Sequence, residues 1–219
     1  MTLQGLALGL LLGLPTAALA QIPAAAPGQA GWTQAAGDCF VWNRAPQIGE
    51  TAVWSGPCKN RRAEGKGSLT WRTGDSTQSY EGEMRDGRIN GHGVYTFSLT
   101  TRYEGTFKDD DFDGSGVMVE PGVRYEGQWR AGKRHGRGLL TTVNDDRYDG
   151  EFQDGAITGR GTLALSDGRK YEGLLLDGKP NGQGTLTDPT GSYNGVWKNG
   201  CFNDGVRRAA FGTSSDTCP

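Results

Sequence analysis

Residues 80–102 read YEGEMRDGRINGHGVYTFSLTTR, and this stretch sets the pattern for most of the chain. Tyr80, Gly82 and Met84 alternate with polar residues, which is the period of a β-strand. A turn-rich segment follows, and alternation resumes after a Gly-x-Gly pair. The stretch therefore predicts a β-hairpin with one apolar and one polar face.

The same pattern recurs with a period of 22 or 23 residues. The units begin at Tyr80, Tyr103, Tyr125, Tyr148, Tyr171 and Tyr193. The first five units carry Gly-x-Gly eleven residues after the tyrosine, and a degenerate earlier copy begins near Trp54. A fixed period of this size indicates a repeat array, in which each unit contacts only its neighbours.

Glycines on the apolar face of a strand often mark the close approach of another group. We therefore expect the aromatic ring of one unit to lie over the glycines of the neighbouring unit. The six tyrosines are interpreted as structural repeat residues. A stacking platform for sugars or bases is the alternative, and the glycine spacing disfavours it. The predicted fold is all-β: an elongated, twisted antiparallel sheet of stacked hairpins in one repeat domain.

The pattern Y-E-G-x-(W/F)-x-x-G-x-x-x-G-x-G resembles the MORN repeat, over residues 80–205 well and over residues 54–79 loosely. The segment DCFVWNRAPQIGETAVWSGPCKNRRAEGKGSLTW, residues 38–71, also resembles the lead-in of exported bacterial MORN proteins. The resemblance implies an elongated sheet of hairpins and a role in binding or scaffolding. Members of the family have been linked to phospholipid head groups and to protein assembly.

Residues 1–20, MTLQGLALGLLLGLPTAALA, are interpreted as a signal peptide cleaved before Gln21. The apolar run is too short to serve comfortably as a membrane anchor, which is the alternative. We expect an exported protein, periplasmic or extracellular.

The expected organisation of the rest follows from the repeat boundaries. Residues 21–31 are predicted to be a flexible lead, and residues 32–53 an N-terminal cap. The repeat array spans residues 54–205, with units starting near 54, 80, 103, 125, 148, 171 and 193, and residues 206–219 form a C-terminal tail.

The chain has four cysteines, two on each side of the intact repeats. Export makes disulfides permissible, and four cysteines allow three pairings between which the sequence alone cannot choose. The local pairs Cys39–Cys58 and Cys201–Cys218 are the economical choice, because the other pairings join the far ends of the chain. A zinc site fits less well, since no C-x-x-C occurs. Local disulfides would tie both ends of the array.

Two turns are rich in basic residues, although the formal net charge of the chain is only −2. The candidate anion-binding residues are Arg130, Lys133, Arg134 and Arg137 in one turn, and Lys59, Arg61 and Arg62 in the other. They suggest a module for anionic phospholipid head groups or an acidic polysaccharide. The default interpretation is a pair of solvated turns, and the net charge gives no reason to expect nucleic acid.

Residues 109–120, DDDFDGSGVMVE, match the spacing of an EF-hand calcium loop. The candidate ligands are Asp109, Asp111, Asp113 and Glu120. However, an EF-hand needs flanking helices, whereas strands are predicted here, and the glycines of this stretch belong to the repeat. We prefer an acidic turn and keep a weak calcium site as the alternative.

No nucleophile elbow or phosphate-binding loop occurs in the sequence, and its carboxylates recur in every unit instead of forming a singular pair. The sequence thus predicts no cofactor and a non-catalytic surface for a protein partner at the cell envelope or outside the cell. A membrane surface or a glycan is the alternative partner. An exposed sheet edge would also be able to pair two chains into a homodimer.

Overall fold

The computed structural model describes residues 30–35, 37–212 and 218. The predicted signal peptide and nearly all of the predicted flexible lead lie outside the described residues. Every regular element of the described part is a β-strand, which confirms the all-β prediction. In that part of the chain, no helix has the length and apolar character needed to cross a membrane.

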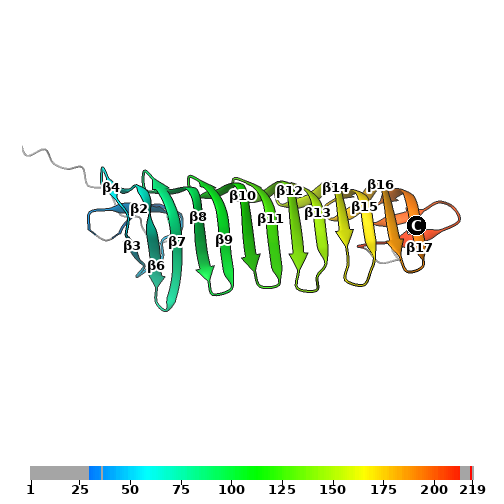
Figure 1. Cartoon of the computed structure of the whole chain (residues 1–219), viewed down its shortest axis with the longest axis horizontal. Coiled ribbons are helices and arrows are strands. Elements are labelled where there is room, and N and C mark those ends of the chain that lie inside the picture. Colours follow the sequence, from blue (N-terminus) through cyan, green and yellow to red (C-terminus); the bar gives the residue numbers. More distant parts are fainter. Residues whose placement is uncertain (1–29, 36, 213–217, 219) are drawn as a thin grey trace, which may run out of the picture.

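Fifteen strands form one open antiparallel sheet that runs the length of the molecule (Figure 1). Apart from β3, which pairs with β6, each strand pairs with the strands that precede and follow it in the chain. The strands are β3 (Thr51–Trp54), β6 (Gly65–Thr73), β7 (Ser76–Arg85), β8 (Arg88–Ser98), β9 (Thr101–Lys108), β10 (Asp111–Glu120), β11 (Val123–Arg130), β12 (Lys133–Thr142), β13 (Arg147–Gln153), β14 (Ala156–Ala164), β15 (Lys170–Leu176), β16 (Lys179–Asp188), β17 (Gly191–Lys198), β18 (Cys201–Asn203) and β19 (Arg208–Ala210).

A second, small sheet caps the N-terminal end. It contains β1 (Gly31–Gln34), β2 (Phe40–Asn43), β5 (Arg62–Ala63) and β4 (Cys58–Lys59), in that order. The cap sheet therefore reaches Ala63, beyond the residue 53 boundary expected from the sequence, while β3 belongs to the large sheet. The Cys39–Cys58 disulfide joins the cap segment to β4.

Each hairpin closes through a two-residue turn whose residues both have positive φ. This is the turn that suits the right-handed twist of paired strands, and it favours Asp-Gly or Asn-Gly. These turns lie along the same side of the sheet, at the ends of the strands. The turns are Asp86-Gly87, Asp109-Asp110, Ala131-Gly132, Asp154-Gly155, Asp177-Gly178 and Asn199-Gly200.

The hairpin tips bend because the first glycine of each Gly-x-Gly lies in a β-bulge. In β8, for example, Gly82 pairs with Gly93 but Glu83 pairs with Asn90, so that two residues are inserted. Gly91 takes φ +67°, which a side chain rarely adopts. The bent tip brings the carbonyl oxygen of Asn90 within 3.3 Å of the Tyr80 hydroxyl.

Neighbouring tips are linked by backbone hydrogen bonds. The N–H of Asp110 donates to the carbonyl of Ile89, and the N–H of Gly132 donates to that of Phe112, each over 2.9 Å. Equivalent bonds link the later tips. The tips thus form a second line of contacts along the array, which covers the tyrosine face of the sheet.

An unbroken line of paired glycines crosses the sheet from β6 to β17. Its members in spatial order are Gly67, Gly82, Gly93, Gly105, Gly116, Gly127, Gly138, Gly150, Gly161, Gly173, Gly184 and Gly195. The tyrosine rings lie on this line, as expected from the spacing.

The prediction that each ring lies over the glycines of the neighbouring unit was wrong. The ring of Tyr80 lies against Gly82 and Gly93 of its own hairpin, not against the glycines of the neighbouring unit. The reason is a local hydrogen bond: the Tyr80 hydroxyl donates to the carbonyl of Glu83, three residues ahead, over 2.9 Å. Tyr103, Tyr125, Tyr148 and Tyr171 repeat this bond, which tilts each ring along its own strand.

Tyr193 departs from the structural role predicted for it. It is only partly buried, and Phe202 takes the place against Gly195. The last unit has lost its Gly-x-Gly, so no glycine-bearing partner strand receives the Tyr193 ring. The predicted tail contributes the edge strand β19, and the Cys201–Cys218 disulfide fastens it. Both predicted disulfides are therefore confirmed.

Candidate functional site

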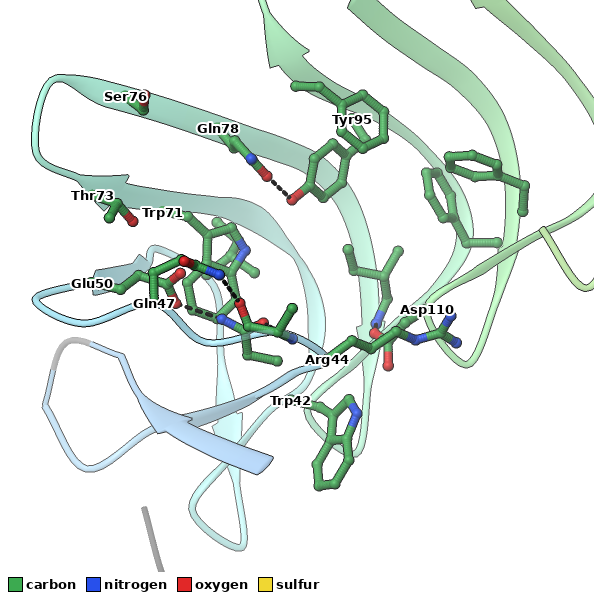
Figure 2. Close-up of a pocket in the computed structure, with 17 residues that line it drawn as sticks. Trp42, Arg44, Gln47, Glu50, Trp71, Thr73, Ser76, Gln78, Tyr95 and Asp110 are labelled. Carbon is green, nitrogen blue, oxygen red and sulfur yellow. Dashed lines mark hydrogen bonds between the residues drawn. The ribbon is translucent and has the colours of Figure 1, made fainter. Parts of the chain in front are cut away.

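A cavity of about 560 Å³ lies between the N-terminal cap and the first hairpins (Figure 2). One side is made by Trp42 of β2 and by the segment that follows β2, with Arg44 and Glu50. The other side is made by the tyrosine face of β6 to β8 and by the tip of the next hairpin. This is the size of pocket that holds a small organic molecule.

The walls of the cavity are largely aromatic. The Tyr95 and Phe97 rings lie 4.4 Å apart, and Phe97 meets Phe112 edge-on at 6.2 Å. Trp71 is buried in the core, whereas Tyr95, Phe97 and Phe112 are partly exposed. The cavity therefore offers apolar surface that is partly shielded from bulk water.

Polar groups interrupt these walls at a few points. The Tyr95 hydroxyl donates to the side-chain oxygen of Gln78 over 2.7 Å. Glu50 accepts a hydrogen bond from the side-chain amide of Asn43. The carboxylate of Asp110 accepts from the N–H of Ile89 over 2.7 Å.

Burial shifts the acidity of these groups. Desolvation raises the pKa of Glu50 and of Asp110 above their ordinary values, although hydrogen bonds oppose the shift in both. Desolvation, with the nearby charges of Glu50 and Asp110, raises the pKa of Tyr95 to about 12. Tyr95 is therefore neutral at physiological pH. Its hydroxyl lies in the electrostatic field of the Glu50 and Asp110 carboxylates.

Both arginines beside the cavity have acidic partners. The Arg44 guanidinium lies 2.6 Å from the Asp111 carboxylate, and that of Arg88 lies 2.9 Å from the Asp110 carboxylate. Among the described residues, the Glu50 carboxylate has no cationic partner. The cavity region therefore carries one uncompensated negative charge.

The four predicted calcium ligands contact different partners. Asp109 lies 3.6 Å from Arg85, Asp111 pairs with Arg44, and Glu120 lies 3.6 Å from Arg134. Asp113 accepts a hydrogen bond from the N–H of the Ala131 turn. Within the described residues, no group of three histidine, cysteine or acidic side chains is arranged to hold a metal ion.

The predicted basic turns are partly neutralised. In the cap, Arg61 lies 3.5 Å from Asp38, and Arg62 lies 2.6 Å from Asp86. Arg62 also lies over the Trp32 ring, 4.3 Å from its centre. In the other turn, Arg130 lies 3.5 Å from Asp154, and Arg134 faces Glu120. Lys59, Lys133 and Arg137 are exposed. Because the other four arginines have acidic partners, the two turns do not form one strong basic patch.

The outer face of the sheet carries a regular row of side chains beside the glycine line. Cross-strand register places Glu81, Val94, Glu104, Val117, Glu126, Leu139, Asp149, Thr162 and Glu172 in succession along this row. Carboxylates thus alternate with aliphatic or hydroxyl side chains. A shallow hollow of about 500 Å³ lies at its C-terminal part, between Arg137 and Asn194.

The sequence interpretation did not find the cavity. One signal for it was present, since only the first two units place an aromatic residue seventeen positions after the unit start, at Trp71 and Phe97. The cap segment that completes the cavity lies outside the repeat, so its position over these residues could not be read from the period.

The geometry defines a linear β-hairpin repeat protein with tied ends. Six segments of the chain match the MORN repeat: residues 62–76, 80–98, 103–119, 125–147, 148–168 and 171–193. Since these segments cover more than half of the chain, the protein belongs to the MORN-repeat family. MORN repeats are commonly modules that bind proteins or membranes and are generally not enzymes. No curated protein matches the chain.

Proposed function

We propose that this protein is an exported, non-catalytic module that binds a protein partner through the outer face of its sheet. The observation that carries the proposal is the row from Glu81 to Glu172, in which carboxylates alternate with Val, Leu and Thr side chains. Its carboxylates recur at about 10 Å, because antiparallel strands lie about 5 Å apart. Such a row offers a protein partner apolar contact together with a fixed pattern of charge, and complementary charge gives specificity to protein–protein recognition.

Three carboxylates of this row, those of Glu104, Glu126 and Glu172, form ion pairs. Arg124 lies 2.7 Å from Glu126, and Lys170 lies 2.8 Å from Glu172, each pair two residues apart on one strand. Such exposed pairs add little stability. They do present alternating charge of both signs, which favours specific recognition of a protein over general attraction to an anionic surface.

Export is supported by the two disulfides, which are compatible with an oxidising compartment. The test is the mass of the mature protein from its native cell. An N-terminus at Gln21 and the absence of free thiols are expected. An intact residue 1–20 segment, or reduced cysteines, would contradict export.

Binding is tested by site-specific photo-cross-linking in the native cell. A photoreactive residue at Glu126 is expected to give one dominant protein adduct. The same residue at Val206, which is exposed in the turn between β18 and β19, serves as the matched control and is expected to give none. Equal labelling at both positions, or adducts at Val206 alone, would refute the outer face as the binding surface.

The second candidate is a module for an anionic phospholipid head group or an acidic polysaccharide. Its support is the exposure of Lys59, Lys133 and Arg137. Flotation with phosphatidylglycerol vesicles tests it directly. Binding that falls steeply with salt and is lost in a double variant, Arg134→Glu with Arg137→Glu, would favour this candidate over a protein partner.

A further inference from the structure

We propose that the cavity between the cap and the first hairpins binds a small organic cation, an ammonium group carried on an apolar body. This site is separate from the outer face, and the inference does not depend on the protein partner proposed above. Three features of the described residues lead to it: the aromatic walls, the uncompensated charge and the engagement of the nearby arginines.

The aromatic walls suit a cation with an apolar body. Tyr95, Phe97 and Phe112 are partly exposed and line the same cavity together with Trp71. Trp42 also lines it, but the Arg88 guanidinium already lies 4.3 Å from the centre of the Trp42 ring. The face of an aromatic ring attracts a cation through its quadrupole, and the attraction grows when the cation is desolvated. The apolar body would cover ring surface that water otherwise meets.

The charge of the cavity selects the sign of the ligand. Glu50 has been moved partly out of water without a cationic partner among the described residues, and desolvation raises its pKa. An ammonium group in the cavity would compensate this charge. The other charged or titratable groups facing the same space are Asp110, Arg44 and Tyr95. Asp110 is paired with Arg88, Arg44 is paired with Asp111, and Tyr95 is neutral, so Glu50 sets the net charge of the cavity.

An anionic ligand fits this arrangement poorly. Among the described residues that line the cavity, Arg44 is the cationic one, and its guanidinium is bound to Asp111 and to the carbonyl of Asp109. An anion would have to displace these contacts and then approach Glu50 and Asp110. A neutral sugar would use the amides of Asn43 and Gln78 but would leave the Glu50 charge uncompensated.

The test compares choline with 3,3-dimethylbutan-1-ol, which has nearly the same shape but carries no charge. Isothermal titration calorimetry on the mature protein is expected to show choline binding more tightly by about tenfold or more, the scale of a desolvated cation–π contact. Equal affinity for the two probes, or no heat from either, would overturn the proposal.

Two variants locate the binding. Glu50→Gln keeps the shape of the side chain and removes the charge, so choline affinity is expected to fall by about tenfold. Glu126→Gln, an identical change on the outer face, is the matched control and is expected to leave choline affinity unchanged. A thermal melt of each variant shows that it is folded. Loss of binding in both variants, or in neither, would contradict the assignment to this cavity.

Further ligands separate the sources of the cation. A neutral disaccharide that binds more tightly than choline would replace the proposal with a sugar site. A short lysine-containing peptide that requires Glu50, with no choline binding, would assign the cation to a partner's side chain and overturn the small-molecule source. Choline binding that requires Glu50 and exceeds both competitors is the expected result.

Discussion

The indole Nε1 of Trp54 donates a hydrogen bond to the carbonyl oxygen of Pro57, 2.8 Å away and three residues ahead. This is the bond that the hydroxyl of Tyr80 makes to Glu83. The Trp54 ring also lies against Gly56 and Gly67, as the Tyr80 ring lies against Gly82 and Gly93. The degenerate first unit therefore keeps the structural device of the repeat with a different aromatic residue.

The ring-over-glycine contact predicts that Gly138→Ala destabilises the protein. A Cβ at this position would collide with the ring of Tyr125, which is fully buried and hydrogen-bonded to Gln128. Overpacking of this kind costs about 1–3 kcal/mol. Urea unfolding should show the loss as a lower midpoint with an unchanged slope.

The control is Ser115→Ala, which also introduces alanine, here by removing an exposed hydroxyl between two glycines of another unit. Its effect should stay within about 0.5 kcal/mol. If Gly138→Ala were as mild as this control, the glycine line would not be needed for the close approach of the rings.

Much of this fold could be predicted from the sequence because its information is local and repeated. Tyr125, Gly127 and Trp129 share a face through strand alternation alone, and all three lie in the predicted strand. The direction of each ring could not be predicted. It depends on a hydrogen bond to a carbonyl group, and a backbone carbonyl leaves no mark in the sequence. Tyr193 shows the same limit, since its surroundings depend on how the array ends.

The turn at Asp109-Asp110 predicts a loss of stability in Asp110→Gly, although glycine suits its φ of 72° better. Relief of the left-handed backbone gains about 1–2 kcal/mol. The change removes the bonds from the carboxylate to the N–H of Ile89 and to Arg88, which are worth about 1.5–3 kcal/mol each. The free energy of unfolding should therefore fall by about 1–5 kcal/mol.

Ala131→Gly is the control for this prediction. Ala131 occupies the first turn position of the next hairpin at φ 48° and loses no side-chain hydrogen bond on substitution. Thermal unfolding of Ala131→Gly should be unchanged or slightly improved. A stabilising effect of Asp110→Gly as well would show that the Asp110 bonds contribute little.

The acidic turn also predicts the response to calcium. Asp111 and Asp110 are already paired with Arg44 and Arg88, at 2.6 Å and 2.9 Å. We expect about 1 mM calcium, the range in which weak extracellular sites bind, to leave the melting temperature unchanged. A rise that magnesium does not reproduce would instead support the EF-hand-like interpretation of Asp109, Asp111, Asp113 and Glu120.

The C-terminal disulfide predicts local unfolding when it is removed. Cys201 begins β18, and its bond to Cys218 closes a loop with a sequence separation of 17. Closing a loop of about this length stabilises a chain by about 3 kcal/mol. In Cys201→Ser with Cys218→Ser, hydrogen exchange should accelerate first in β18 and β19, while β9 to β12 keep their protection. Uniform acceleration along the sheet would show that the array unfolds as a single unit.

The candidate cavity was less predictable than the fold because it joins segments that are not related by the repeat. Glu50 lies in a turn-like segment, QIGE, whose sequence gives no sign of burial. Its contact with Asn43 and its position across from Tyr95 depend on how the cap is placed against β6 to β8. A single sequence does not contain that placement.

Glu50 gives the last prediction, a pH-dependent difference between the native protein and Glu50→Gln. Desolvation raises the pKa of Glu50 in the folded state above its unfolded value. The folded state therefore holds this proton more tightly, and the associated stability is present below the unfolded pKa and is lost as pH rises through the folded pKa. At neutral pH the ionised, half-buried carboxylate is unfavourable, so Glu50→Gln should melt at the same or a higher temperature than the native protein. The advantage should disappear as the pH falls below the ordinary pKa of a glutamate. Thermal melts of both proteins, from neutral pH down to below the ordinary pKa of a glutamate, measure this difference in melting temperature. A Glu50→Gln variant that is less stable at neutral pH would mean that the charge is compensated within the protein.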